Sequence, residues 1–258
     1  MKLRADQVTV RYGSVRALTD FSLTVNAPEI VALIGPNGSG KSTALHALAG
    51  LAQRASGNVT VDDRPVSSWP RRALARRISL LPQAPIAPEA MTVDQLVRQG
   101  RFAHLGLFRP FTAKDTEAVA WALEHTGLVD LADRDLRALS GGERQRAWIA
   151  AALAQEAATL LLDEPTSFLD IGHQIEVLEL LCRLSKVRGV SVVLSIHDIN
   201  HALAIADRIL LLDRGVLRFE GRPGELAAGV LVGDVFAVKG SFAHIGDGPP
   251  VFHAAIHR

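Results

Sequence analysis

The chain has 258 residues, of which 48% are hydrophobic and 21% are charged, and its formal net charge is +1. This length fits one large domain, or a core with a subdomain. So balanced a charge gives no support for nucleic-acid binding, which usually leaves a basic excess, and one cysteine excludes an internal disulfide. The first six residues lack the apolar core of a signal peptide, and the longest apolar stretch, 147–162, is interrupted and shorter than the ~20 residues that span a bilayer. We therefore expect a cytosolic chain.

The first third of the chain is predicted to hold strands around one glycine-rich loop. Residues 3–10 and 21–25 alternate apolar and polar side chains, as half-exposed strands do. Residues 30–34 are a continuous apolar run, which is typical of a buried strand, and a helix over 42–49 follows the loop.

The middle of the chain is predicted to be mostly helical. A short strand over 77–81 leads to Gln83. From residue 92 to 136 the pattern holds no convincing strand, so we expect a helical insertion. Its helices are predicted over 93–101, 114–126 and 129–132.

Strands and helices alternate again in the last part of the chain. Strands are predicted over 159–162, 190–195, 209–212 and 216–219, and helices over 143–155, 172–187 and 199–206. This alternation predicts an α/β fold with a mainly parallel sheet and helices on its faces. The tail from about Gly240 is rich in glycine and proline and is expected to be irregular.

The glycine-rich loop matches the phosphate-binding loop pattern, and it lies between a buried strand and a helix as that pattern requires. Its glycines let successive backbone N–H groups face a β-phosphate. Lys41 is expected to reach the β- and γ-phosphates, and the Ser42 hydroxyl to bind Mg²⁺. The predicted phosphate-binding residues are Gly35, Pro36, Asn37, Gly38, Ser39, Gly40, Lys41, Ser42 and Thr43.

Two acidic residues end the apolar strand over 159–162. Buried strands do not tolerate charges in mid-run, so carboxylates at the exit indicate a site at the sheet's C-terminal edge. Asp163 is expected to hold Mg²⁺ through water; capping a helix is its alternative role. Glu164 is expected to polarise the water that attacks the γ-phosphate.

His197 follows another apolar strand and is expected to donate to the γ-phosphate. Its i, i+4 spacing with His201 also suits a metal pair, but no third ligand lies nearby in the sequence. We therefore expect Asp198 and Asn200 to cap the next helix.

Two further side chains are candidates mainly because of their context. The Gln83 amide is expected to reach Mg²⁺ or the attacking water, although a lone glutamine is usually a surface residue. Tyr12, the sole tyrosine, lies in a predicted turn where its ring could stack on adenine, and an ordinary turn aromatic is its alternative.

A second helix start in the chain also attracts phosphate. Ser140, Gly141, Gly142 and Glu143 open the predicted helix over 143–155. The first N–H groups of a helix lack partners and its dipole is positive there, so this helix start favours an anion. One nucleotide does not obviously need both helix starts.

Together these motifs resemble the ATPase domain of ABC proteins in order and spacing, over roughly residues 3–221. The resemblance implies a P-loop NTPase core of the ABC type in a single domain over 1–258. It further implies an N-terminal antiparallel β subdomain, a helical subdomain at about 84–140 and a short C-terminal extension at about 222–258.

The resemblance also implies the cofactors ATP and Mg²⁺ and a homodimer. In this family two ATPase domains pair head to tail, and the serine-glycine-glycine element of one closes over the ATP of the other. Tyr12 matches the adenine platform and residues 167–170, with Asp170, match the D-loop. The implied catalytic residues are Glu164, His197 and Gln83; the implied Mg²⁺ residues are Ser42, Gln83 and Asp163.

Within the family, the chain resembles a transporter ATPase. Gln83 and Ser140 are 57 residues apart (140 − 83), which leaves no room for the long coiled coil of chromosome-structuring relatives. Translation-factor relatives have two cassettes in one chain, and this chain has one. The resemblance implies two membrane permease subunits, an indirect periplasmic or surface substrate-binding protein, and a peripheral position on the cytoplasmic face of a bacterial inner membrane.

Finer features resemble the importers of iron-siderophore complexes, haem and vitamin B12. These features are residues 166–174 and 97–101, with His104 and Phe108. A haem importer ATPase is the first expectation. A soluble ABC ATPase that remodels a cytosolic complex, such as an iron-sulfur assembly scaffold, and an exporter ATPase are the alternatives.

Overall fold

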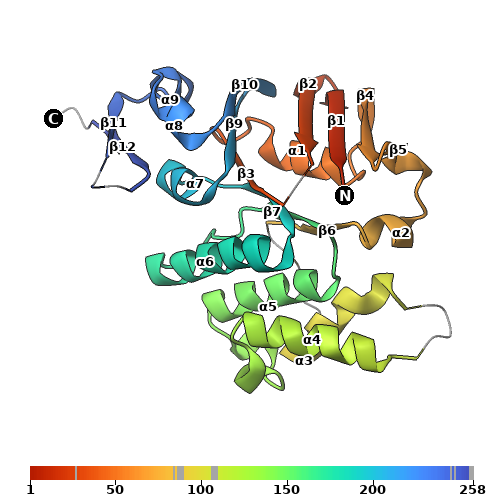
Figure 1. Cartoon of the computed structure of the whole chain (residues 1–258). Helices are drawn as coiled ribbons and strands as arrows, with labels where there is room; N and C mark the ends of the chain where they lie inside the picture. Colours follow the sequence, from red (N-terminus) through yellow and green to blue (C-terminus); the bar gives the residue numbers. More distant parts are fainter. Residues whose placement is uncertain are drawn as a thin grey trace. The chain divides into compact units, whose positions relative to one another are not determined.

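The computed structural model describes residues 1–26, 28–83, 85, 90–105, 110–244, 246 and 248–255. The chain divides into two compact units, one of Met1–Ser67 with Ser191–Arg258 and one of Ser68–Val190. Figure 1 labels their helices and strands. Phe108 lies outside the described residues. In the part of the chain that the structure describes, no helix is both long enough and apolar enough to cross a membrane.

The first unit is built on a sheet of antiparallel and parallel strands. Its strands are β1 (Leu3–Tyr12), β2 (Val15–Val25), β3 (Ile30–Ile34), β4 (Arg54–Val61), β5 (Arg64–Pro65), β8 (Ser191–Ser195), β9 (Arg208–Asp213) and β10 (Val216–Gly221). Their order is β5-β4-β1-β2-β10-β9-β3-β8. β1 pairs antiparallel with β2 and β4, whereas β3 pairs parallel with β8 and β9. The predicted α/β class, with antiparallel strands at the N-terminus, is confirmed.

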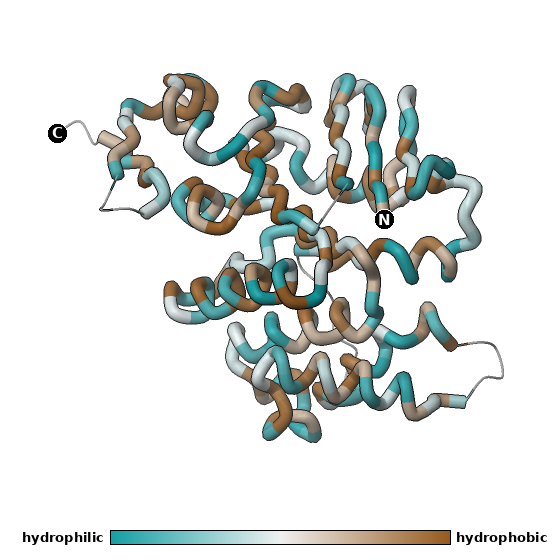
Figure 2. The backbone as a smooth tube through the Cα atoms, viewed as in Figure 1, coloured by the Kyte–Doolittle hydropathy of each residue, from teal (hydrophilic) through white to brown (hydrophobic). Residues whose placement is uncertain are grey.

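The parallel strands form the apolar centre of this unit. Every residue of β3 and of β8 is buried, as their continuous apolar runs predict. Figure 2 shows the hydrophobic colour concentrated along β3 and β9.

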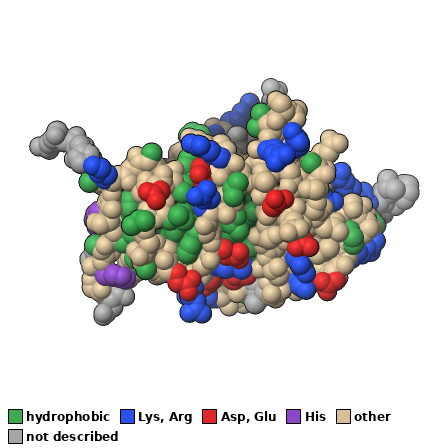
Figure 3. All heavy atoms as spheres, turned by 90° about the horizontal axis from the view of Figure 1, so that it is seen from above, with side chains coloured by type: hydrophobic (Ala, Val, Ile, Leu, Met, Phe, Trp, Pro, Cys, Tyr) green, Lys and Arg blue, Asp and Glu red, His purple; other side chains and the backbone are tan. Residues whose placement is uncertain are grey.

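On the face drawn in Figure 3, acidic and basic side chains are interspersed, in keeping with the net charge of +1.

The helices of the first unit are α1 (Lys41–Leu48), α7 (Ile199–Ile205), α8 (Pro223–Ala227) and α9 (Leu231–Phe236). The tail then forms an antiparallel hairpin of β11 (Gly240–His244) and β12 (Pro250–Ala254). The expectation of an irregular tail is therefore wrong. Gly246, Gly248 and Pro249 lie between the two strands, whereas Gly240 and Pro250 are strand residues and Phe242 and Phe252 pair across the hairpin. In Figure 1 the hairpin lies beside α7.

The second unit holds two parallel strands and a group of helices. The strands are β6 (Ile78–Leu81) and β7 (Thr159–Asp163). The helices are α2 (Arg71–Ala75), α3 (Val93–Gln99), α4 (Ala113–His125), α5 (Gly141–Ala154) and α6 (Ile171–Arg188). Short 3₁₀ segments are η1 (Val66–Ser68), at the border of the two units, and, within the second unit, η2 (Gly100–Ala103), η3 (Val129–Leu131) and η4 (Leu136–Ala138). The predicted helical stretch over 92–136 is confirmed for its described residues, 92–105 and 110–136, and α3 and α4 pack on α5 (Figure 1).

A buried guanidinium joins these three helical segments. Arg101, 1% exposed, follows α3. Its Nε donates to Asp115 Oδ1 of α4 at 3.0 Å, and its Nη1 donates to the Ala154 carbonyl oxygen of α5 at 2.7 Å. Nη1 also pairs with Glu156 Oε2 at 2.8 Å. Because Asp115 is fully buried, this ion pair stabilises the group only while both charges are present.

Candidate nucleotide site

The phosphate loop is shaped by two glycines that no other residue could replace without strain. Gly35 has φ +147°, and a Cβ there would lie 2.1 Å from the Leu212 carbonyl oxygen. Gly40 has φ +104°, and its Cβ would lie 2.6 Å from the Ala17 carbonyl oxygen. The loop is thus pressed against the backbones of β9 and β2, which only glycine allows.

The polar groups of the loop suit a phosphate. Lys41 is 5% exposed, and its Nζ donates to the carbonyl oxygens of Gly35 at 2.8 Å and Pro36 at 3.1 Å. Among the described atoms, the buried Ser39 Oγ has no hydrogen-bond partner. Asn37 and Gly38 are exposed, and because glycine has no side chain, the exposed surface of Gly38 is backbone. A cation held at the loop and an unmatched hydroxyl fit an anionic group better than an apolar one.

His197 stands at the same sheet edge as the loop. Leu33 of β3 is the register partner of Ser195 of β8, and the Ile196 N–H donates to the Leu33 carbonyl oxygen at 3.1 Å. Gly35 and His197 therefore each follow one of these partners by two residues. His197 is exposed. The structure thus places two predicted site elements at the carboxyl ends of neighbouring parallel strands, where ligands bind in such sheets.

The helix after His197 is capped by one of the two predicted residues. Asp198 accepts from the backbone N–H groups of Asn200 at 2.8 Å and His201 at 3.2 Å, as expected of a cap. The expectation for Asn200 is wrong. Because Asp198 already fills the cap position, Asn200 lies within α7, and its amide contacts the backbone of Phe252.

Tyr12 ends β1 beside a tight turn at Gly13 and is 52% exposed. The hairpin that it closes approaches the phosphate loop, because a Cβ at Gly40 would lie 2.6 Å from the Ala17 carbonyl oxygen. The Thr19 N–H also donates to the Gly215 carbonyl oxygen at 2.7 Å, and the Gly215 N–H donates to the Ser39 carbonyl oxygen of the loop at 2.9 Å. The ring is thus available for stacking at this edge. Its contact with adenine stays a prediction.

In the second unit, Gln83 and Glu164 meet at the carboxyl ends of two strands. Leu81 of β6 and Leu162 of β7 are register partners, and the two residues each follow by two positions. Gln83 Nε2 donates to Glu164 Oε2, and Ser167 Oγ donates to the same oxygen at 2.9 Å. Asp163 and Glu164 are 4% and 8% exposed. The Glu164 carboxylate is therefore oriented from two sides.

Sequence reasoning did not assign Ser167 this contact. Its only signal is the spacing of three residues from Glu164, which suits a turn; the Ser167 N–H also donates to the Glu164 carbonyl oxygen at 3.1 Å. Glu164 has φ +50°, a left-handed conformation that is uncommon outside glycine. The turn thus aims the carboxylate back toward Ser167.

The helix α5 begins at Gly141, two residues before its predicted start. Ser140 caps it in a reciprocal box: its hydroxyl accepts from the Glu143 N–H at 3.2 Å, and its N–H donates to Glu143 Oε2 at 2.8 Å. The Ser140 N–H and then its hydroxyl lower the pKa of Glu143. Gly142 is covered by a ring, because a Cβ there would lie 2.5 Å from His173 Cδ2.

His173 is held in turn by Asp170, which caps α6. The His173 N–H donates to Asp170 Oδ1 at 2.9 Å, and its ring Nδ1 lies 2.8 Å from the same oxygen. These contacts lower the pKa of Asp170, the backbone N–H contributing most. The neighbouring apolar side chains face solvent: Phe168 is 91% exposed and Ile171 is 75% exposed. The nucleotide contact expected of Asp170 stays a prediction.

The predicted site residues fall into two groups. The first unit holds Tyr12, the loop over 35–43 and His197, and the second holds Gln83, Ser140–Glu143, Asp163, Glu164 and Asp170. The expected Mg²⁺ residues Ser42, Gln83 and Asp163 come from both units, so their joint site stays a prediction. A groove of about 400 Å³ in the second unit is lined by Gln83, Pro85, Gly141, Arg144, Gln145, Trp148, Ser167, Phe168 and Leu169.

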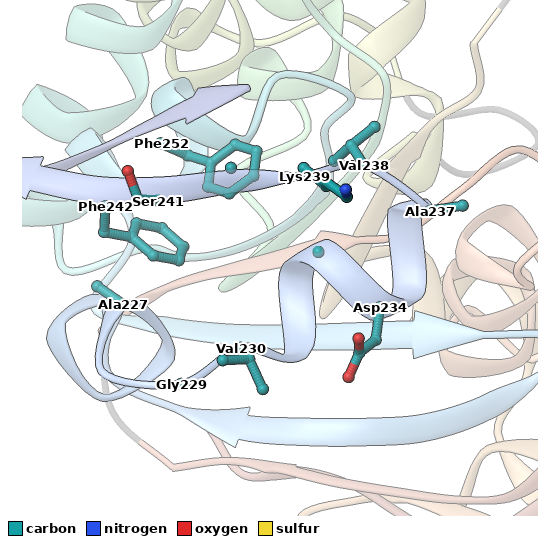
Figure 4. Close-up of a pocket in the computed structure, with 12 residues that line it drawn as sticks. Ala227, Gly229, Val230, Asp234, Ala237, Val238, Lys239, Ser241, Phe242 and Phe252 are labelled. Carbon is teal, nitrogen blue, oxygen red and sulfur yellow. The ribbon is translucent and has the colours of Figure 1, made fainter. Parts of the chain in front are cut away.

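A larger cavity lies away from the predicted residues. It has a volume of about 710 Å³, lies between α9 and the β11–β12 hairpin, and is drawn in Figure 4. Phe242 and Phe252 line it together with Lys239 and Asp234. It contains none of the residues predicted to bind a nucleotide.

Comparisons with known proteins show the family of this chain. Residues 18–167 match the family described as ABC transporter. The chain is 41% identical to the petrobactin import ATP-binding protein FpuD of Bacillus anthracis, over 92% of this chain and 87% of that protein. It is 40% identical to the ferric enterobactin transport ATP-binding protein FepC of Escherichia coli, over 92% and 88%. It is 39% identical to the hemin import ATP-binding protein HmuV of Rhodococcus jostii, over 91% and 79%.

Solved structures give the same result. One is an ABC transporter described as metal-chelate type, in an inward-facing conformation; it is similar with a TM-score of 0.85 and 29% identity, over 98% of this chain and 97% of that one. A bacterial ABC transporter cassette solved as a dimer has a TM-score of 0.76 and 28% identity, over 85% and 98%. The chain belongs to the ABC transporter family, in which it is an ATP-hydrolysing cassette subunit.

Proposed function

We propose that this chain powers an importer of iron chelates of the siderophore or hemin type. The observation that carries the proposal is the likeness to import ATP-binding proteins at about two-fifths identity over nearly the whole chain. A carrier described as metal-chelate type is also similar over 98% of the chain. The import ATPases among these relatives favour a transporter over a cytosolic remodelling ATPase.

The proposal covers the class of iron chelates rather than haem alone. The relatives named for petrobactin, enterobactin and hemin are 41%, 40% and 39% identical to this chain. Such close values do not separate the substrates, because in this family the cargo binds to other subunits. Haem is thus one candidate cargo within the class.

ATP would bind at the phosphate loop of the first unit. Lys41 would exchange its contacts with Gly35 and Pro36 for phosphate oxygens, since a charged acceptor makes the stronger hydrogen bond. The Tyr12 ring would stack on adenine. Ser42, Gln83 and Asp163 would hold Mg²⁺, which neutralises charge on the β- and γ-phosphates when bound.

Two copies would then close head to tail. Ser140 and Gly142 at the start of α5 offer a second phosphate-seeking helix end, and the exposed Phe168 and Ile171 beside it suit contact with another chain. A similar cassette has been solved as a dimer. In this arrangement the γ-phosphate bridges both copies and favours closure.

Hydrolysis would remove that bridge. Glu164, oriented by Gln83 and Ser167, would take the proton of the attacking water, and His197 would donate to the γ-phosphate. Catalysis here rests on positioning and charge, with little covalent chemistry for the protein to perform. The like-charged products would favour reopening, so ATP and ADP would stabilise different states.

The membrane partners follow from the same proposal. Two permease subunits would receive the closing movement at the cytoplasmic face of a bacterial membrane, and a substrate-binding protein outside would deliver the chelate. The chain itself would stay peripheral, as an ATPase docked on those subunits.

The experiment is reconstitution of this chain with a candidate membrane permease of the iron-chelate importer type. Proteoliposomes with ATP are expected to accumulate a ferric siderophore or hemin, and those made with Lys41→Ala are expected to accumulate neither. Parallel uptake of ⁵⁵Fe-labelled siderophores and of hemin assigns the cargo. Co-purification with a soluble scaffold and no permease would overturn the transport proposal.

A further inference from the structure

The side chain of Asn200 joins α7 to the C-terminal hairpin. Its Oδ1 accepts from the Phe252 N–H at 2.7 Å, and its Nδ2 donates to the Phe252 carbonyl oxygen at 3.3 Å. The backbone N–H can only donate, so the amide orientation is determined by its partners. One side chain thus satisfies both backbone groups of a residue 52 positions away.

The hairpin register explains why these groups face the helix. Phe252 pairs with Phe242, and the ring centroids are 5.1 Å apart. In an antiparallel pair, alternate residues turn their backbone groups away from the partner strand. Phe252 is such a residue. The side-chain amide of Asn200 binds its backbone N–H and carbonyl groups, as the peptide group of a neighbouring strand would. This protects part of an exposed strand edge.

The same contact connects the hairpin to the start of α7. Asp198 caps that start by accepting from the backbone N–H groups of Asn200 and His201. On the other side, the Ile196 N–H is bound to Leu33 of β3. His197 lies between these anchors with its side chain exposed. A change in the tilt of α7 would therefore move the His197 ring.

We propose that Asn200 is a positioning residue for His197, and that the β11–β12 hairpin is the support against which Asn200 holds α7. The inference rests on the proposed role of His197 in hydrolysis. The helix has only seven residues, of which Ala202 and Leu203 are buried, so its own packing area is small. It packs on β3, α8 and β12, and the two hydrogen bonds of Asn200 connect its first turn directly to the hairpin. Figure 4 shows the Phe252 ring at the cavity on the hairpin.

A double-mutant cycle tests this in the full chain. The steady-state kcat and KM for ATP are measured for the parent, Asn200→Ala, His197→Ala and the double variant. His197→Ala is expected to lower kcat by about 10²-fold, as loss of a proton-transfer or charge-stabilising group does. Asn200→Ala is expected to lower kcat about tenfold with KM unchanged, because a small misplacement has a large effect on rate. In the His197→Ala background, Asn200→Ala should change kcat by less than about twofold.

Two further variants separate positioning from folding. Asn200→Asp keeps the acceptor for the Phe252 N–H and loses the donor, so its kcat should fall between those of the parent and Asn200→Ala. The matched control His201→Ala removes a side chain from the same turn of α7 and should keep the parental kcat.

The outcomes distinguish the two proposals. An equal fall on Asn200→Ala in both backgrounds, or no fall in either, overturns the positioning role and leaves the function of His197 intact. A parental kcat for His197→Ala overturns the catalytic role of His197 itself, and the positioning role with it.

Discussion

The Gln83 side-chain amide donates to Glu164 Oε2. Each of the two residues lies two positions after a member of one register pair, which joins the last residue of β6 to its partner in β7. Parallel register alone therefore brings them together. With Ser167 donating to the same oxygen, two neutral donors orient the carboxylate without neutralising its charge. Such an arrangement suits a base that must keep one direction toward water.

Glu164→Gln should keep the fold and stop hydrolysis. A glutamine carbonyl can still accept from Gln83 and Ser167, but an amide takes no proton. We expect phosphate release to fall by ~10²–10³-fold, and ATP with Mg²⁺ to trap a dimer on size-exclusion chromatography. The control Glu179→Gln, on an exposed position of α6, should hydrolyse ATP like the parent. Parental turnover by Glu164→Gln would remove this residue from the mechanism.

Ser140→Arg should block closure of the dimer while the isolated chain still binds nucleotide. The longer, charged side chain would occupy the space into which the γ-phosphate bound to the partner copy's phosphate loop is proposed to move. In the Glu164→Gln background we expect no ATP-dependent dimer, with the affinity for fluorescent ATP within about twofold of the parent. Ala120→Arg, on the exposed side of α4, is the control for added charge. Weak binding by the monomeric variant would mean that Ser140 serves its own nucleotide.

Gly35→Ala and Gly38→Ala should differ although both change the same loop. The Gly35 methyl group would lie 2.1 Å from the Leu212 carbonyl oxygen, whereas at Gly38 no described atom lies within 4 Å. We expect Gly35→Ala to lower the free energy of unfolding by roughly 3 kcal/mol and to abolish ATP binding. Gly38→Ala, strained only by its φ of +76°, should lower it by about 1 kcal/mol. The free energy of unfolding of each variant is measured by urea titration. Equal losses for the two variants would contradict the close contact between Gly35 and the Leu212 carbonyl oxygen.

Asp115→Asn should destabilise the chain in a pH-dependent way. Burial alone would raise the pKa of Asp115, but hydrogen bonds from the Thr112 hydroxyl and N–H and from Arg101 outweigh it and hold the pKa well below its usual range. A lowered pKa stabilises the fold above the unfolded value of about 3.9, and this contribution is lost as the pH falls below it. At pH 7 we expect a loss of about 3 kcal/mol, since Arg101 would stay buried without its partner.

The measurement is the urea midpoint of parent and variant at pH 7, 5 and 3. Their difference should be similar at the two higher values and shrink at pH 3. Asp130→Asn, at an exposed position of η3, should show no such difference. A difference that stays constant down to pH 3 would show that the Asp115 charge does not stabilise the fold.

Sequence patterns predicted the elements whose neighbours are close in the chain or buried on both faces. The apolar run of β3 and the helical periods of α4 and α6 correspond closely to the structure. β4 was not predicted, because the first half of Arg54–Val61 is polar and exposed and only Val59 and Val61 alternate inward. Its pairing with β1 across some fifty residues decides its conformation.

The candidate site likewise divides into features with a local sequence signal and contacts between distant segments. The motifs predicted roles for Lys41, Glu164 and Ser140, because phosphate binding and water activation require those residue types at those spacings. Contacts between distant segments, such as Ser167 with Glu164 or Asn200 with Phe252, depend on where the chain folds back and leave little local signal. The tail was misjudged for that reason.

The ring of His173 has a mechanical consequence. It leaves no room for a methyl group at Gly142, and Asp170 holds it through the His173 N–H and ring Nδ1, so the first turns of α5 and α6 are in direct contact. The turn that holds Ser167 against Glu164 leads directly into the first turn of α6. Gly142 is therefore linked through His173 and Asp170 to the turn that orients the Glu164 carboxylate. In the proposed dimer, this short linkage would connect the helix start that meets one nucleotide with the carboxylate that acts on another.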